Sequence, residues 1–141
     1  MPGRVTRWTM TALLGLGCAS SPLAPADLAG SYRATTMSVT INGATTNMLA
    51  KGASAVVELA AAGKLTGRVV VPVIAGVQTV PVDDDLAGTY TLVNDHVQLK
   101  PTVGSYLSGL IFTAAPPELR AYLTLQDPNR QGQFTIILSR Q

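Results

Sequence analysis

Apolar and polar residues alternate with a period of two over most of the chain after Asp27. Residues 65–73, 119–125 and 134–139 each place aliphatic side chains on one face and mostly polar or small ones on the other. This period is typical of antiparallel strands that bury one face. We therefore expect residues 27–141 to form a single all-β domain.

Short turn signals separate the alternating runs. Asn42-Gly43 suits a two-residue type I′ hairpin, because both of its positions take positive φ. Gly63 separates the runs 54–61 and 65–73, Gly76 precedes the run 77–82, Asn94-Asp95 separates 89–93 from 96–100, and residues 127–132 close the last hairpin. Such short connections join neighbouring strands, so we expect an up-and-down meander of about eight to ten strands. Closure into a small barrel would remove its exposed edges.

Three segments allow two interpretations. Residues 53–65 fit both helical and strand spacing, and we favour a strand because a hairpin to Leu65 follows naturally. Residues 103–112 are either a flexible lid over a barrel mouth or, as we favour, one more strand with irregular ends. Residues 69–74 are apolar on both faces, which indicates burial under another element or a partner surface, and Pro72 favours an edge or bulge there.

The first 17 residues have the character of an export signal. Arg4 and Arg7 precede an apolar stretch of about ten residues, too short to span a bilayer. Leu14-Gly15-Leu16-Gly17-Cys18 resembles the lipobox of bacterial lipoproteins, with Gly15 where that pattern prefers Leu. The resemblance implies that Cys18 is lipidated, that residues 18–26 are a tether, and that the protein is an outer-membrane lipoprotein facing the periplasm. The alternatives are an ordinary secretory signal cleaved near residues 19–21 and a cytoplasmic protein.

Composition and charge exclude several classes of protein. The chain has 141 residues, of which 47% are hydrophobic and 13% charged, so it is not intrinsically disordered. Ten Lys and Arg minus the two in the leader leave eight, against eight Asp and Glu, and this balance argues against a nucleic-acid partner. One Cys and one His exclude a disulfide framework and a zinc cluster built from this chain alone. One Trp, four Tyr and two Phe are too few for the two aromatic girdles of a lipid-spanning barrel.

No residue pattern indicates catalysis. His96 is the only His, and its neighbour Asp95 should point to the opposite face of a strand, so we expect no Ser-His-Asp triad. Residues 83–85 are three consecutive Asp without the ligand alternation of a calcium loop, and we expect a solvated loop that ends a strand. Glu58 and Glu118 are single acids without a partner for acid–base work. We expect no enzyme activity, no cofactor and no metal.

A six-residue motif occurs twice. Asp27-Leu28-Ala29-Gly30-Ser31-Tyr32 recurs as Asp85-Leu86-Ala87-Gly88-Thr89-Tyr90. We expect each copy to open a strand, with Gly allowing close approach and Tyr plugging a barrel end with its hydroxyl in water. Chance recurrence of a short strand-entry motif is the alternative.

These segments together resemble the small lipocalin-like lipoproteins of bacteria. The resemblance covers the Leu-x-Gly-x-Tyr strand at residues 28–32, the hairpins at 57–71 and 88–99, and the alternating segment 119–138. Larger lipocalins carry Gly-x-Trp near the start and a late Arg that covers the Trp. Here Tyr32 stands in place of the Trp, and Arg140 is the candidate for the Arg. The resemblance implies a barrel with an apolar cup for a small hydrophobic molecule.

We therefore expect a lipid-anchored barrel that binds or shields a small apolar ligand. Aliphatic and aromatic side chains would line the cup and one or two hydroxyls would orient the ligand; the candidates are Tyr32, Val69, Val71, Tyr90, Leu123 and Phe134. The alternative is a solid-cored interaction module that holds an envelope protein or inhibits a hydrolase. The interior decides between them. A connected cavity lined by the inward positions would favour the cup, and contact across the axis without a void would favour the interaction module; these positions are Val69, Val71, Leu123, Leu125, Phe134 and Ile136.

Overall fold

A computed structural model describes residues 22–127 and 130–141. The predicted export signal, the predicted lipidation of Cys18 and the tip of the last hairpin at residues 128–129 lie outside the described residues. The predicted tether is described only from Pro22 onward.

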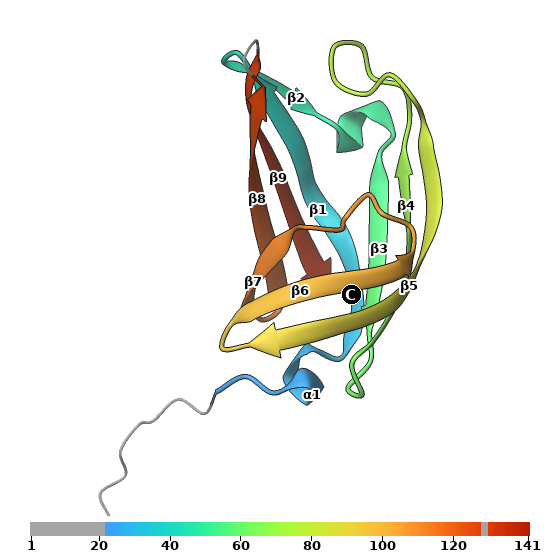
Figure 1. Cartoon of the computed structure of the whole chain (residues 1–141), viewed down its shortest axis with the longest axis vertical. Coiled ribbons are helices and arrows are strands. Elements are labelled where there is room, and N and C mark those ends of the chain that lie inside the picture. Colours follow the sequence, from blue (N-terminus) through green and yellow to red (C-terminus); the bar gives the residue numbers. More distant parts are fainter. Residues whose placement is uncertain (1–21, 128–129) are drawn as a thin grey trace, which may run out of the picture.

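The described chain is almost entirely β-structure (Figure 1). Its elements are α1 (Pro25–Leu28), β1 (Gly30–Ile41), β2 (Ala44–Asn47), the 3-10 helix η1 (Leu49–Lys51), β3 (Ser54–Leu59), β4 (Lys64–Val71), β5 (Val82–Val93), β6 (His96–Val103), β7 (Ile111–Ala115), β8 (Glu118–Asp127) and β9 (Arg130–Arg140). All strand pairs are antiparallel, and β9 pairs with β1. The strands other than β2 therefore close an eight-stranded barrel, and β2 is an extra strand on the second half of β1. The prediction of an all-β barrel is confirmed.

Local turn chemistry fixes the register of the first hairpins. Asn42 and Gly43 have φ of 50° and 84°, and Ile41 pairs with Ala44 across them. This is the two-residue hairpin predicted from Asn-Gly. The ambiguous segment 53–65 forms β3, the turn at Gly63 and the start of β4, so the strand interpretation is confirmed.

Three predicted boundaries are wrong. The three Asp residues at 83–85 lie within β5 and pair with β4, where Arg68 donates two hydrogen bonds of 2.9 Å to the Asp83 carboxylate. Residues 72–81 are a connection with one isolated bridge, Ile74 to Gln78, and the predicted strand 77–82 does not form. Residues 104–110 are also a connection, between β6 and β7, and the favoured extra strand there is wrong.

The repeated motif does not have one structural role. Its first copy includes the end of α1 and the start of β1, but its second copy lies in the middle of β5. The prediction that both copies open strands is therefore wrong for the second. Gly88 nevertheless allows a close approach, because a Cβ there would overlap the carbonyl oxygen of Lys100 on β6, next to a register shift between the two strands.

The barrel has a closed pole and an open pole. The closed pole is the lower end in Figure 1, where α1 and the β3–β4 turn lie. The open pole is the upper end, with β2 and the end of β8. The interior near the closed pole is solid, since its side chains are at most 7% exposed: Leu28, Tyr32, Ala34, Leu59, Leu65, Tyr90, Leu119 and Leu138.

The barrel wall is incomplete toward the open pole. β8 pairs with β9 along its whole length, but it pairs with β7 only through Glu118–Arg120. Likewise, β5 pairs with β4 from Val82 onward, but with β6 only from Ala87. Between these two strands, the described residues supply no further strand, and the connection 104–110 crosses this part of the interior (Figure 1). The fold therefore leaves an opening between β8 and β5.

Candidate functional site

A pocket of about 240 Å³ occupies the open half of the barrel. Its lining is mainly aliphatic and aromatic and comes from β1, β8, β9, the residue between β2 and η1, and the connections 72–81 and 104–110: Val39, Met48, Val77, Gln78, Tyr106, Ser108, Leu110, Leu123, Leu125 and Phe134. The strands supply the back wall, and the two connections supply the sides of the mouth. The topology thus brings residues from distant parts of the chain to one apolar hollow.

The back wall is built from rows of side chains that cross β1, β9 and β8 in register. Met37, Ile136 and Ala121 form one row, and all three are at most 1% exposed. The next row toward the open pole, Val39, Phe134 and Leu123, lines the pocket. The solid core therefore ends, and the pocket begins, between two adjacent rows of one sheet face.

Solvent reaches the apolar lining at the two rows nearest the open pole, which contain Leu123 and Leu125. Leu123 is 41% exposed and Leu125 38%, although both continue the inward face of β8. Leu125 pairs with Gly132, which adds no side chain to its row. Keeping about two-fifths of a leucine in water forgoes roughly 1 kcal/mol of burial energy for each residue. These leucines form an apolar surface that the fold leaves uncovered.

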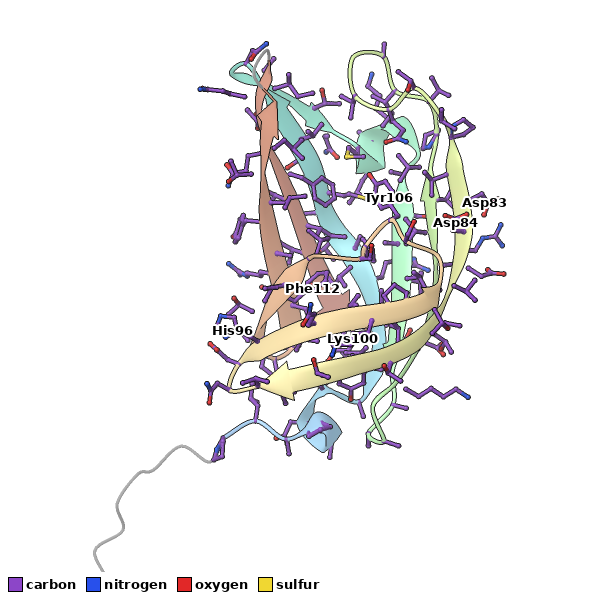
Figure 2. All side chains as sticks on the ribbon, in the orientation of Figure 1. Asp83, Asp84, His96, Lys100, Tyr106 and Phe112 are labelled. Carbon is purple, nitrogen blue, oxygen red and sulfur yellow. The ribbon has the colours of Figure 1, made fainter. Side chains whose placement is uncertain are left out.

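The connection 104–110 forms the front of the pocket. Leu107 and Leu110 anchor it in the core, with exposed fractions of 0% and 3%. Gly104 and Gly109 take positive φ, 76° and 81°, close to its two ends. Directly before the first anchor, the Tyr106 ring meets the Phe134 ring edge-on, with centroids 6.4 Å apart and planes at 86°. Figure 2 shows Tyr106 on this connection, above β6 and toward the open pole.

Three lining residues bring polar side chains to the pocket. Gln78 donates from Nε2 to the Val80 carbonyl at 2.7 Å, and Ser108 donates from Oγ to the Ser105 carbonyl at 2.6 Å. The Tyr106 hydroxyl forms no hydrogen bond with any atom that the structure describes, and burial raises the pKa of this phenol. The Tyr106 hydroxyl can thus donate or accept a hydrogen bond with a bound molecule, whereas Gln78 and Ser108 each already donate one to a backbone carbonyl.

The predicted orienting hydroxyls, Tyr32 and Tyr90, lie at the closed pole, remote from the pocket. Tyr32 is fully buried and donates to the Leu28 carbonyl at 2.7 Å. Tyr90 donates to the Ala60 carbonyl at 2.6 Å, and its burial raises the pKa of its hydroxyl. Both side chains plug the barrel end as predicted, but their hydroxyls are engaged in protein hydrogen bonds, so the expectation of a wet hydroxyl is wrong.

Arg140 covers Tyr32, as the lipocalin resemblance implies for the late Arg. Its guanidinium carbon lies 5.5 Å from the Tyr32 ring centroid, and its Nη2 donates to the Tyr32 hydroxyl at 2.9 Å and to the Asp27 carbonyl. Gly30 leaves room for this side chain, because a Cβ there would lie 3.2 Å from Arg140 Nε. α1, β1 and β9 are thereby joined at the closed pole.

The structure brings only two of the six predicted ligand-binding residues to the pocket. Leu123 and Phe134 line the pocket, as does Leu125. Val69 and Val71 point inward but are fully buried on β4, and neither lines the pocket. Tyr106 and Leu110 were candidates only as part of a possible lid, while Met48 and Val77 carried no sequence signal, since they lie in connections whose course depends on the whole fold.

The polar clusters that the sequence singled out lie on the outer surface or near the mouth. Asp95 and His96 do not point apart: Asp95 occupies the turn, and its Oδ1 lies 2.8 Å from His96 Nδ1, with both side chains more than half exposed. Glu118 pairs with Arg120. Within residues 22–127 and 130–141, no group of three or more His, Cys, Asp or Glu residues is placed to hold a metal ion.

A second hollow, of about 360 Å³, is larger but lies on the outside of the barrel. Its residues include the outward-facing Glu58 and Thr66, which share a hydrogen bond of 3.3 Å. It is a surface groove beside the closed pole, and Leu59 is the one buried aliphatic residue in its lining. The inner pocket is therefore the better candidate site.

The chain matches no protein-family model, no curated protein and no solved structure. In the described part of the chain, no helix is both long enough and apolar enough to cross a membrane.

Proposed function

We propose that this protein is an exported, lipid-anchored envelope protein of the lipocalin-like kind that holds a small hydrophobic molecule in its barrel. The observation that carries the proposal is the pocket with its uncovered leucines, Leu123 and Leu125. Concave apolar sites with few polar groups are the usual form of small-molecule sites. A ligand there would cover the apolar surface that folding leaves in water. The arrangement of Arg140 over Tyr32 adds support for the family.

The position of the anchor relative to the pocket fits this role. Leu23 packs against the core, and α1 follows it at the closed pole. Cys18 is five positions before Leu23 in the sequence, so a lipid on Cys18 would be within about 18 Å of this pole. Val39 lies seven residues beyond Tyr32 along β1, or about 23 Å. The proposed anchor would thus hold the closed pole at the membrane and leave the pocket facing the aqueous compartment.

A second candidate function is an interaction module that binds an extended peptide. Among the described strands, none pairs with β8 at Ala121–Leu125 on the side away from β9, nor with β5 at Val82–Leu86 on the side away from β4. Free strand edges accept an added strand. This alternative assumed a solid core, whereas the pocket leaves part of the open half of the interior unfilled, which favours ligand binding.

Native mass spectrometry of the protein purified from its own envelope tests the proposal. We expect a co-purified small molecule that is retained by the wild type and by Tyr122→Glu, and is lost in Leu123→Glu. Tyr122 is the matched control, since it lies on the outer face of the same strand and is 58% exposed. Release of Cys18→Ser from membranes tests the anchor separately. Wild-type protein that is free of any bound molecule would contradict ligand binding.

A further inference from the structure

We infer that the pocket selects an uncharged, compact molecule of about ten non-hydrogen atoms, and that it discriminates against fatty acids and other carboxylates. This inference rests on the proposed function and specifies its ligand class. It follows from the charge, the volume and the one available hydroxyl of the pocket.

The lining carries no counter-charge for an ionic ligand. None of the pocket residues that the structure describes is Lys, Arg, His, Asp or Glu. A carboxylate that enters such a site loses its hydration without gaining an ion pair, and this costs far more than the transfer of a neutral polar group. The inner face of β5 adds a negative charge near the opening, because Asp84 shares the face of buried Leu86 and is exposed. An anion is thus disfavoured both in the pocket and on the way to it.

The volume sets the size of the ligand. An apolar cavity of about 150 Å³ holds one benzene molecule, or roughly 25 Å³ for each non-hydrogen atom. On that scale the pocket of about 240 Å³ holds about ten such atoms. A long acyl chain would leave much of its length in water. A single substituted ring matches the space, and the Tyr106 and Phe134 rings offer aromatic edges and faces to it.

Tyr106 supplies the polar contact. Tyr106 directly precedes the anchor Leu107, and its hydroxyl forms no hydrogen bond with the atoms that the structure describes. A ligand hydroxyl or carbonyl could therefore pair with it without breaking an existing hydrogen bond. Ser108 and Gln78 are engaged with backbone carbonyls and would have to be released first.

Calorimetric titration near pH 7 with p-cresol, p-toluate and laurate tests this inference. The first probe is a neutral ring with one hydroxyl, the second is a similar ring with a carboxylate, and the third is a fatty acid. We expect p-cresol to bind at least tenfold more tightly than either anion. Tyr106→Phe should weaken p-cresol binding about two- to tenfold, as for one lost hydrogen bond. Leu123→Glu should abolish binding, whereas Tyr122→Glu should retain it.

Each other outcome overturns the inference in a distinguishable way. If p-toluate or laurate binds as tightly as p-cresol, and Leu123→Glu abolishes that binding, the ligand class is wrong while ligand binding by the pocket stands. If none of the three probes binds, the ligand class is also wrong, and the mass spectrometry of envelope-purified protein decides on the proposed function separately. If Tyr106→Phe leaves p-cresol affinity unchanged, Tyr106 does not make the polar contact.

Discussion

Replacement of Arg140 by Met should open the closed pole of the barrel, although the two side chains are similar in size. The methionine retains an apolar stem over the Tyr32 ring but loses the guanidinium. The two hydrogen bonds from Nη2, to the Tyr32 hydroxyl and to the Asp27 carbonyl, disappear. These bonds join the end of β9 to α1 and to the start of β1, so their loss should loosen the segment that precedes the barrel.

The expected loss of stability is a difference between opposing terms. Each hydrogen bond from a charged donor contributes about 1.5–3 kcal/mol, and the stacking of the cation on the ring contributes about 1 kcal/mol. Against this, Arg140 Nε is buried without a hydrogen-bond partner among the described residues. Removal of that unsatisfied group returns about 1–3 kcal/mol, and water can replace the lost donor at the exposed Asp27 carbonyl. We expect a net loss of about 2–3 kcal/mol in the free energy of unfolding.

Urea and thermal denaturation followed by circular dichroism measure this loss. For a domain of this size it corresponds to a fall in Tm of about 8–12 °C. Arg120→Met is the matched control, because Arg120 lies on the outer face of β8 and its ion-pair partner among the described residues is the nearby Glu118. Exposed ion pairs contribute little, so this variant should unfold like the wild type. Equal midpoints for the two variants would refute the conclusion that Arg140 seals the closed pole.

Three further predictions concern the wall and the front of the pocket. Gly88→Ala should lower the free energy of unfolding by about 1–3 kcal/mol in urea denaturation, because its methyl group would overlap the Lys100 carbonyl; unchanged stability would show that β6 can shift there freely. Leu107→Ala should cost about 2–5 kcal/mol and speed amide exchange in residues 104–110, and a stability loss without faster exchange there would contradict the anchoring role of Leu107. Burial raises the pKa of Tyr106 in the folded protein. The contribution of its protonated phenol to the free energy of unfolding is therefore complete below the ordinary tyrosine pKa of about 10, and it is lost as the pH rises through the higher folded-state pKa. Between about pH 9 and pH 11, the wild type should therefore lose more stability than Tyr106→Phe, and parallel losses would be inconsistent with a buried phenol.

Local chemistry made much of the barrel predictable. The Asn42-Gly43 hairpin and the strands on either side of Gly63 depend on residues within a few positions of each other. Alternation also identified the inward faces of β8 and β9. The prediction of a loop at the three Asp residues of β5 is wrong, because their pairing partners on β4, including Arg68, are distant in the sequence and no local pattern specifies that pairing.

The pocket could be predicted only in part, because burial depth has no local signal. Ile136 and Phe134 are equivalent in the alternation of β9, yet one is in the solid core and the other lines the pocket. The difference arises where pairing between β7 and β8 stops after Arg120, which no local pattern specifies. The hydroxyls of Tyr32 and Tyr90 were predicted to orient the ligand, but both already donate hydrogen bonds to backbone carbonyls.

Methyl NMR of the wild-type protein during titration with p-cresol tests the central claim most directly. If the open half of the barrel is the binding site, the methyl signals of Val39, Leu123 and Leu125 should shift with one common affinity. The methyl signals of Leu65 and Leu138, near the closed pole, should stay in place. Shifts that are confined to the closed pole, or spread evenly over both halves, would contradict a pocket at the open end.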